Sequence, residues 1–335
     1  MRALIVGLGA VGQRHARNLR ALRPDIELHA WRRRGRAGTI GPALEFDHAA
    51  DPAGALGIVT HASIEAALAA RPDVAVVASP SALHLADTLA VLRGGCHTYV
   101  EKPLSHTIDG LGRLHAAAAG RVVAIGCQWR FHPLVEALRD LVTSRVLGDI
   151  VRADVDFSEY LPDWHPYEDY RESYAACAEL GGGVVLSQIH DWDLVHWLFG
   201  PVRIVTARGG TRGELEVDVE DTVEAQCATA RGQVFVRQTF AEREARRVIT
   251  VRGALATATC NLRTGRLEVT PDVAHGLDVP DYDRNTMFLA AMDDFLRCAE
   301  SGTAPRTALA DGIAVLKVAL AAKASLARGG PVPTQ

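Results

Sequence analysis

The segment GLGAVG at residues 7–12 constrains the fold most strongly, because its glycines follow an apolar run and open a helical pattern. In G-x-G-x-x-G, the first glycine permits a tight turn and the second lets the backbone approach a pyrophosphate, while the third allows close helix–strand packing. The first N–H groups of such a helix carry positive potential. A purely structural glycine turn is the alternative. The residues predicted to bind a dinucleotide are Gly7, Gly9, Ala10, Val11 and Gly12.

Alternating strand and helix patterns around this loop predict a doubly wound α/β domain of the Rossmann type. Apolar strands are expected in RALIVGLG, IELHAW, VAVVASP, CHTYVEKP and RVVAIGC, with helical runs between them. Continuous Val, Ile and Ala strands between helices indicate a parallel sheet that is covered on both faces. This dinucleotide-binding domain is predicted to span residues 1–127, with a ligand cleft at the carboxyl ends of its strands.

A second domain is predicted at residues 128–335, since 335 residues exceed one ordinary core. Its strands are longer and alternate apolar with polar side chains, as in DIVRADVDFSEY (149–160) and in a hairpin through Ala230, Arg231 and Gly232. This pattern favours an α+β domain with an open, mostly antiparallel sheet that binds substrate and partner subunits. Helices are expected at about 132–143, 184–198, 285–300 and 306–327.

Composition argues against several classes of function. A net charge of −4 and the lack of a membrane-length apolar run give no reason to expect nucleic acid or a membrane as a partner. The six cysteines are scattered, without the Cys or His spacing of a zinc site, so no metal is predicted. Most of them sit in apolar runs as expected for reduced thiols, and no signal peptide is recognisable, which favours a cytoplasmic protein.

The end of the second predicted strand is basic, with the sequence HAWRRRG. NAD enzymes usually carry an acidic residue here that binds the ribose 2′-hydroxyl. In its place stand arginines, whose guanidinium groups can bind a 2′-phosphate in bidentate fashion. Arg32 and Arg33 are therefore predicted to favour NADP over NAD, and Trp31 is a candidate to stack on adenine. A solvated basic loop is the alternative.

The segment TYVEKPLSH (98–106) places Glu101 and Lys102 at the end of the fourth predicted strand. Pro103 biases Lys102 toward an extended conformation, and a cis peptide bond between them would hold it there. A lysine near a nicotinamide can donate a hydrogen bond to a substrate oxygen and relay a proton, and Glu101 can offset its charge or contact the cofactor ribose. On its own, E-K-P is more often a turn than a site.

Three further segments accompany this motif: GLGAVGQRHARNL, ASPSALHLA (78–86) and ELGGGVVLSQIHDWDLVHWLFG (179–200). With them, nearly the whole chain resembles the glucose–fructose oxidoreductase/inositol dehydrogenase family (Gfo/Idh/MocA). The resemblance implies that Lys102 is the active-site lysine and contacts both cofactor and substrate. The segment GCQWRFHP (126–133), which includes His132, is implied to border the nicotinamide and the substrate. Further cofactor contacts implied by the resemblance are Ser79, Pro80, His84, Gln128 and Arg130.

A second catalytic candidate, His190, follows three glycines on a predicted helix. Asp193 lies three residues later, so the two side chains can meet, and a carboxylate can orient a neutral imidazole that takes the proton of an alcohol. A core histidine is the alternative, and the family's H-x-x-D motif favours catalysis. Inositol-dehydrogenase-like members carry an aspartate one turn earlier, where Ser187 and Gln188 are the candidates to replace it.

The segment EYLPDWHPYEDYRESYAA (159–176) is rich in aromatic and polar side chains that suit a carbohydrate. An interaction surface between subunits is the alternative. Arg130 and Arg171 are candidates to bind a phosphate or carboxylate, and by resemblance the leading substrate class is a sugar, cyclitol or sugar nucleotide. The residues predicted to contact substrate are Lys102, Arg130, Trp164, His165, Tyr170, Arg171, Ser187 and His190.

The predicted function is thus hydride transfer between NADP, or less favourably NAD, and a secondary alcohol or ketone. Two alternatives stay open: an imine or diol reductase of the biliverdin-reductase or dihydrodiol-dehydrogenase type, and a non-catalytic NADP-sensing regulator. A sensor needs neither Lys102 nor His190. The resemblance also implies a homodimer or homotetramer formed through the open face of the second domain's sheet.

Overall fold

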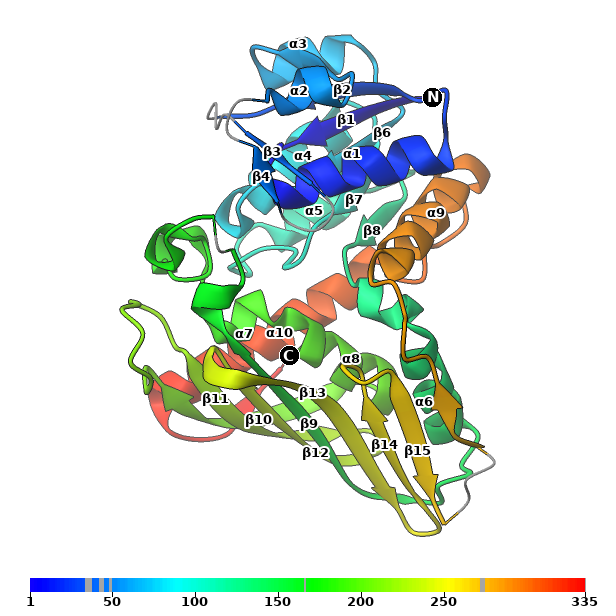
Figure 1. Cartoon of the computed structure of the whole chain (residues 1–335), viewed down its shortest axis with the longest axis vertical. Coiled ribbons are helices and arrows are strands. Elements are labelled where there is room, and N and C mark those ends of the chain that lie inside the picture. The colour runs from blue at the N-terminus through cyan, green and yellow to red at the C-terminus, as the bar shows by residue number, and fades with distance from the viewer. Residues whose placement is uncertain (34–37, 42–44, 48–49, 166, 272–274, 335) are drawn as a thin grey trace. The chain divides into compact units, whose positions relative to one another are not determined.

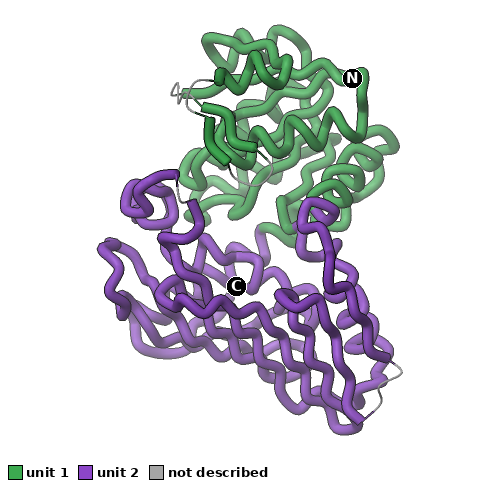
Figure 2. Tube along the Cα trace, viewed as in Figure 1, with its two compact units in different colours: residues 1–127, 288–312 green, residues 128–287, 313–335 purple. Residues whose placement is uncertain are grey.

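The chain forms two compact units, each with its own sheet (Figure 2). A computed structural model describes residues 1–33, 38–41, 45–47, 50–165, 167–271 and 275–334. The first unit comprises residues 1–127 and 288–312, and the second comprises residues 128–287 and 313–335. Segment 288–312, which the sequence places in the second domain, packs with the first unit because the Phe288 and Phe295 rings meet His15 and Tyr99 edge-on.

The first unit is built on a six-stranded sheet whose neighbouring strands all pair in parallel (Figure 1). Across the sheet the strands are β5 (Val59–His61), β2 (Glu27–Trp31), β1 (Arg2–Val6), β6 (Val74–Val77), β7 (His97–Val100) and β8 (Val123–Ile125). The chain moves outward from β1 in one direction and later returns to its other side at β6. The crevice at the carboxyl ends of β1 and β6 is therefore the expected ligand site of this topology.

Helices connect these strands, as the alternating sequence pattern predicts. They are α1 (Ala10–Leu22), α2 (Pro52–Ala55), α3 (Ile64–Ala69), α4 (His84–Arg93) and α5 (Leu111–Ala117), and most of α9 (Asn285–Ser301) also belongs to this unit. A small hairpin of β3 (Thr39–Ile40) and β4 (Phe46–Asp47) precedes α2. The predicted doubly wound domain is confirmed, although β5 is not among the strands expected from the sequence.

The second unit is built on a nine-stranded sheet that is antiparallel except for the parallel pair β9–β12. Across it the strands are β16 (Leu277–Asp278), β15 (Arg266–Thr270), β14 (Thr257–Asn261), β13 (Ala241–Gly253), β9 (Ile150–Tyr160), β12 (Gly232–Thr239), β11 (Thr222–Thr229), β10 (Val202–Gly210) and β17 (Val332–Pro333). Its helices are α6 (Pro133–Thr143), α7 (Val184–Ser187), α8 (Ile189–Phe199) and α10 (Leu309–Arg328). The predicted mixed, mostly antiparallel sheet is confirmed, as is the β11–β12 hairpin.

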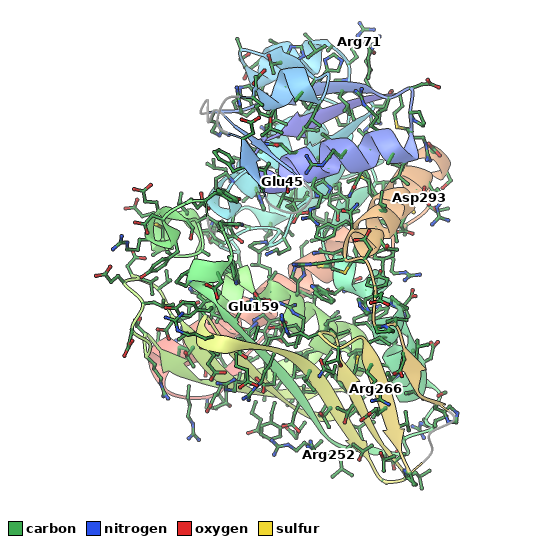
Figure 3. The ribbon with its side chains drawn as sticks, viewed as in Figure 1. Glu45, Arg71, Glu159, Arg252, Arg266 and Asp293 are labelled. Atoms are coloured by element: carbon green, nitrogen blue, oxygen red, sulfur yellow. The ribbon has the colours of Figure 1, made fainter. Side chains whose placement is uncertain are left out.

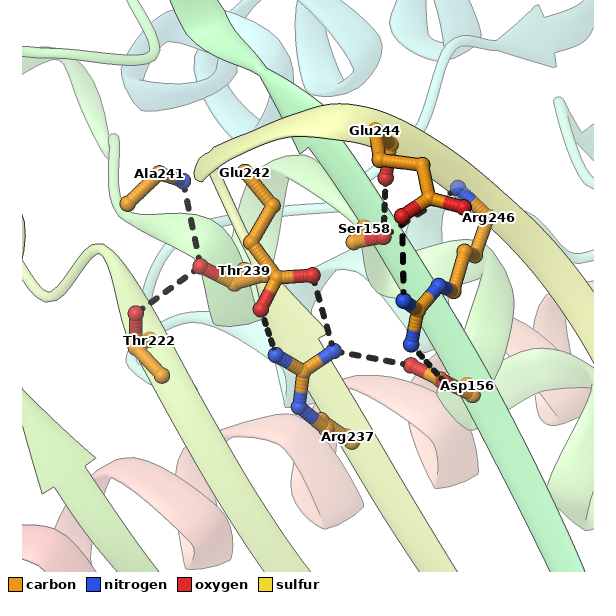
Figure 4. A network of polar contacts seen from close by, with 9 residues as sticks. All are labelled: Asp156, Ser158, Thr222, Arg237, Thr239, Ala241, Glu242, Glu244 and Arg246. Carbon is orange, nitrogen blue, oxygen red and sulfur yellow. Dashed lines mark hydrogen bonds and ion pairs between the residues drawn. The ribbon is translucent and has the colours of Figure 1, made fainter.

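One face of this sheet is buried and the other is polar. Along β9, β12 and β13 every second side chain is buried, and the helices α7 and α8 pack on that face. On the opposite face Arg237 pairs with Asp156 (3.0 Å) and with Glu242, while Arg246 pairs with Glu244 at 3.2 Å (Figure 4). This outer face is therefore covered by paired charges rather than by an apolar layer.

Within the described parts of the chain, no helix combines the length and apolar character needed to cross a membrane.

Candidate active site

The glycine loop after β1 has a conformation and a packing that require two of its three glycines. Gly7 has φ +98°, a region that side-chain-bearing residues rarely adopt, and a Cβ there would lie 2.7 Å from the Ala78 carbonyl oxygen. A Cβ on Gly12 would lie 2.0 Å from the carbonyl oxygen of Gly7. A Cβ on Gly9, by contrast, would meet no described atom within 4 Å. Internal packing therefore explains Gly7 and Gly12, whereas Gly9 fits the close approach of a ligand.

The same loop supplies a site for an anion. Gly9 caps the thirteen-residue helix α1 and has no side chain that could accept a hydrogen bond from the helix. The first N–H groups of a helix have no intrahelical partner, and their dipoles favour negative charge. Ala10 and Val11 open this helix beside the crevice between β1 and β6. These residues fit the pyrophosphate of a dinucleotide.

The glycines give a matched pair of predictions. Gly9→Ala should weaken NADPH binding about tenfold or more, while the melting temperature stays close to that of the wild type, because the added methyl group meets only the ligand. Gly12→Ala should lower the melting temperature as well, because its methyl group overlaps the Gly7 carbonyl. Calorimetric titration and thermal unfolding measure both effects. A Gly9→Ala protein that binds NADPH as tightly as the wild type would contradict a pyrophosphate site here.

The arginines at the end of β2 are paired with carboxylates. Arg33 binds Asp87 of α4 and stacks on Trp31, with its guanidinium carbon 4.6 Å from the ring centre. Arg32 lies 3.6 Å from Asp51. Arg34 and Arg36 of the same basic cluster fall outside the described residues. The positive charge of Arg32 and Arg33 is therefore partly compensated by these two carboxylates. The sequence prediction does not include this pairing.

His84 ties together two loops that were both predicted to line the cofactor. Its ring nitrogens lie 2.6 Å from the carbonyl oxygens of Ser79, after β6, and of Pro103, after β7. Burial lowers the pKa of His84, while hydrogen bonds to these carbonyl groups oppose that shift. The imidazole is only 2% exposed, so His84 holds the loops of Ser79 and Lys102 in place rather than presenting its ring to a cofactor. Pro80 lies in the first of these loops, where it caps the short helix that precedes α4.

Glu101 is engaged within the first unit and does not point outward as a ribose ligand would. Its carboxylate binds Nε2 of His15 in α1 at 2.7 Å and accepts a hydrogen bond from the N–H of Lys102 at 3.2 Å. Gly126 makes room for it, because a Cβ there would lie 3.1 Å from the carboxylate. Burial raises the pKa of Glu101, but His15 and the charge of Lys102 outweigh burial, so the pKa is lowered. Glu101 therefore anchors the residue before Lys102 to α1.

Lys102 occupies the position that the sequence predicts, directly after β7 at the carboxyl end of the sheet. The Lys102–Pro103 peptide bond is cis, as expected from the sequence. The residue is partly exposed. Anchoring of its neighbours by His15 and His84 fixes the backbone from which the ammonium group extends.

In the second unit, His190 lies just after a break between two helices. The predicted single helix at 184–198 is interrupted at Gln188, with φ −97° and ψ 33°. Gln238 of β12 stabilises this break, because its side-chain amide donates to the Gln188 carbonyl (2.7 Å) and to the Asp191 carboxylate (2.6 Å). The Gln128 amide nitrogen lies 3.5 Å from Nε2 of His190, a long contact that brings these two predicted residues together.

The side chain of Gln188 contacts a partly buried ion pair. Glu159 lies at the end of β9 and is labelled in Figure 3. The Gln188 amide donates to its carboxylate at 3.0 Å, and Arg247 of β13 binds the same carboxylate at 2.7 Å. Burial raises the pKa of Glu159, but the charge and hydrogen bond of Arg247 outweigh it, so the pKa is lowered. Gln188 is thus occupied as a link between helix and sheet. Ser187 is buried at the end of α7, and its N–H donates to Gly183.

Asp193 pairs with Arg130, a partner that the sequence prediction does not include. Its carboxylate accepts three hydrogen bonds from Arg130, at 2.6, 3.0 and 3.1 Å, and the two side chains are 1% and 2% exposed. A buried carboxylate requires a cationic partner, and the planar guanidinium supplies one with bidentate geometry. The same pairing corrects the prediction for Arg130, whose guanidinium is used inside the second unit and not to bind a phosphate.

His132 caps α6 and stacks on Trp129, with ring centres 5.6 Å apart. Its Nδ1 accepts a hydrogen bond from the N–H of Leu134 at 3.2 Å. Burial lowers the pKa of His132 to about 4. The neutral imidazole of His132 therefore stabilises the start of α6. Its capping hydrogen bond and its stacking on Trp129 explain why the ring is buried.

This burial predicts a pH dependence of stability. Below about pH 6.5 the imidazole takes up a proton in the unfolded chain but not in the folded one. The free energy of unfolding should therefore fall between pH 6.5 and about 4, where the folded group also protonates. His132→Asn keeps a capping side chain without this titration, so its melting temperature should fall less between pH 7 and pH 5. Equal decreases in the two proteins would contradict the neutral buried imidazole.

The aromatic segment predicted to hold substrate makes several contacts with other residues of the second unit. The Trp164 ring meets Phe240 edge-on at 5.1 Å, and His165 lies 3.0 Å from Glu168. The Tyr170 hydroxyl accepts a hydrogen bond from the Glu216 N–H at 3.2 Å. Arg171 pairs with both Asp169 and Glu216, each at 2.6 Å, so its guanidinium is already bound by two carboxylates.

Several residues that contact the predicted site residues in the two units are not identified by the sequence motifs. They are His15, Asp87, Glu159, Gln238 and Arg247. His15 alone carried a usable indication, since it is a polar residue on the apolar stripe of α1. The other four lie on different strands and helices from their partners, and no local spacing marks them. Among the described residues, no group of three or more His, Cys, Asp or Glu side chains is arranged to hold a metal ion.

Models of the two domains of one protein family match this chain. The model "Oxidoreductase family, NAD-binding Rossmann fold" matches residues 1–127, and the model "GFO/IDH/MocA C-terminal domain" matches residues 135–259. Together these matches cover the whole six-stranded sheet and the larger part of the nine-stranded sheet.

Similar proteins include a D-glucoside 3-dehydrogenase of Escherichia coli, 32% identical over 158 residues, which are 45% of this chain and 41% of that protein. The matched stretch thus spans less than half of that relative. A D-xylose 1-dehydrogenase (NADP(+)) 2 of Haloferax volcanii is 28% identical over 78% of this chain and 81% of its own. A solved levoglucosan dehydrogenase in complex with NADH has a TM-score of 0.83 at 18% identity and covers 100% of this chain and 99% of its own. At 18% identity, this similarity shows a shared fold and nothing about the substrate.

Proposed function

Because the chain belongs to the Gfo/Idh/MocA family of oxidoreductases, we propose that it transfers a hydride between NAD(P) and a secondary alcohol or ketone. The proposed substrate is a sugar, a cyclitol or a sugar nucleotide. The observation that carries this proposal is the glycine loop at the crevice of the parallel sheet, with Gly9 open to a ligand and Lys102 at the end of a strand in the same sheet. A dinucleotide site and a polarising lysine are the two parts that such a reaction needs.

The chain's proposed role toward the cofactor is to bind and orient it. The helix N-terminus at Gly9, Ala10 and Val11 holds the pyrophosphate. The bound nicotinamide supplies or accepts the hydride. Arg32 and Arg33 are proposed to contact the adenosine end, with a preference for NADP over NAD that their pairing with Asp51 and Asp87 moderates.

Lys102 and His190 are proposed as the catalytic residues. The Lys102 ammonium group donates a hydrogen bond to the substrate oxygen, which stabilises the negative charge that develops there. In the oxidation His190 takes the hydroxyl proton as the hydride leaves the carbon, and in the reduction it returns that proton. Lys102 is one of only three lysines among 36 Lys and Arg residues. A lysine can exchange its proton where an arginine cannot, which distinguishes this position from the chain's many arginines.

The carbohydrate class is supported by relatives and by the aromatic segment. The relatives are named as acting on a D-glucoside and on D-xylose, and half-buried aromatic rings such as Trp164 suit the C–H faces of a sugar. The pairing of Arg130 and Arg171 with carboxylates removes the argument that they bind an anionic group. Assembly through the outer face of the nine-stranded sheet stays a prediction from the family resemblance.

A substrate panel tests this proposal. The protein is incubated with NADP⁺ or NAD⁺ and a set of sugars, cyclitols and sugar nucleotides, and the absorbance of the reduced nicotinamide is followed. Turnover of at least one of these alcohols is expected. Turnover restricted to imines or to non-carbohydrate carbonyls would contradict the substrate class, and tight cofactor binding without any turnover would indicate a sensor.

A further inference from the structure

A buried carboxylate on α4 pairs with an arginine that follows β2. Asp87 has a side chain that is only 2% exposed, whereas Arg33 is 43% exposed and can be reached by a ligand. Asp87 accepts a hydrogen bond from the Ser79 hydroxyl at 2.7 Å and pairs with the Arg33 guanidinium through its other oxygen. Trp31 supports the opposite side of this arrangement by stacking under Arg33.

This ion pair extends past the glycine loop. Arg33 follows β2, Asp87 lies on the helix after β6, and β1 lies between these two strands in the sheet. The pair of Arg33 and Asp87 therefore joins elements on the two sides of β1, whose carboxyl end leads into the glycine loop. The adenosine half of a dinucleotide bound on that loop lies at the end of β2, next to the same guanidinium.

The carboxylate that faces the adenosine end thus comes from α4 and not from β2. A 2′-phosphate attracted by Arg33 also experiences the negative charge of Asp87, while a 2′-hydroxyl does not. Arg33 has five N–H donors, so one pairing leaves others for a ligand, but its charge is partly compensated. Asp87 should therefore weaken the binding of NADP(H) selectively and leave the binding of NAD(H) nearly unaffected.

We propose that Asp87, through Arg33, determines how strongly the protein distinguishes NADP(H) from NAD(H). The inference rests on the proposed function only in that it requires a nicotinamide dinucleotide on the glycine loop. It assigns to α4 a specificity-determining residue that acts through another side chain. Ser79 supports it by holding the second oxygen of the same carboxylate.

The test is binding of NADPH and NADH without substrate, measured by cofactor fluorescence or calorimetry. Asp87→Asn keeps the shape of the side chain and its acceptor oxygen but removes the charge. It should tighten NADPH binding about tenfold and change the Kd of NADH by no more than about twofold. Asp25→Asn is the matched control, because it removes the same charge from an exposed turn before β2, at the opposite end of the strands, and it should alter neither Kd.

Arg33→Gln provides a second variant at an exposed position, in case Asp87→Asn does not fold. It should weaken NADPH binding about tenfold with little change for NADH. In the double variant, Asp87→Asn should no longer affect NADPH, because the effect acts through the guanidinium. Equal changes for both cofactors, no change in either variant, or a full Asp87→Asn effect that persists without Arg33 would each overturn the proposal. A wild-type protein that binds neither cofactor would instead refute the proposed function.

Discussion

Replacing Lys102 by alanine should lower kcat/KM by about 10³-fold, while the Kd values of NADPH and NADH stay within about threefold of the wild type. The ammonium group is expected to act on the substrate oxygen, where charge develops during hydride transfer, and to lie near the nicotinamide and not near the adenosine or pyrophosphate. The surrounding backbone should persist, because His15 holds Glu101 and His84 holds Pro103, the residues on either side of Lys102. Steady-state kinetics and cofactor titration of the same preparation measure the two quantities.

Lys317→Ala is the matched control for this experiment. Lys317 is an exposed lysine on α10, and its removal changes the net charge by the same amount. It should leave kcat/KM unchanged. A Lys102→Ala enzyme that retains most of its activity, or that loses activity only because it no longer binds cofactor, would contradict the assigned role.

Breaking the ion pair between Arg130 and Asp193 should destabilise the second unit by about 3–5 kcal/mol, because either single truncation removes the oppositely charged partner of a buried charge. Asp193→Ala and Arg130→Ala should have similar effects. Urea unfolding, followed by probes in each unit, measures the loss of stability and locates it. The double variant Arg130→Met/Asp193→Leu fills the site with apolar groups and should recover much of the stability.

A surface pair serves as the comparison. Asp169→Ala removes a partner of the exposed Arg171 and should cost at most about 1 kcal/mol. If Asp193→Ala also proved nearly neutral for stability but changed the pH profile of kcat, the sequence-based role of Asp193 as the partner of His190 would be restored. The structure predicts the opposite result.

Much of the fold was predictable because its determinants are local. The strands of the parallel sheet are continuous apolar runs, and glycine or proline ends the helices between them. Packing over long sequence distances escaped prediction. Segment 288–312 joins the first unit through Phe288 and Phe295, and the helix break at Gln188 depends on Gln238, fifty residues away on a strand.

The candidate site divides in the same way. The positions of Gly9 and Lys102 follow from motifs, because a loop after a strand end needs only its neighbours to be placed. Predicted pairings of side chains fared worse. Spacing along one helix favours a contact between His190 and Asp193, but the buried guanidinium of Arg130 is the stronger partner for a carboxylate. Likewise, the basic sequence after β2 gives no indication that Asp87 compensates Arg33.

The most direct test of hydride transfer uses an alcohol from the active part of the panel with deuterium on its carbinol carbon. The protein, NADP⁺ or NAD⁺, and this alcohol are incubated together, and the reduced cofactor is analysed by NMR and mass spectrometry. One deuterium at C4 of the nicotinamide, on a single face of the ring, is the predicted result. Reduced cofactor without deuterium, or deuterium distributed over both faces, would contradict direct transfer in a defined site.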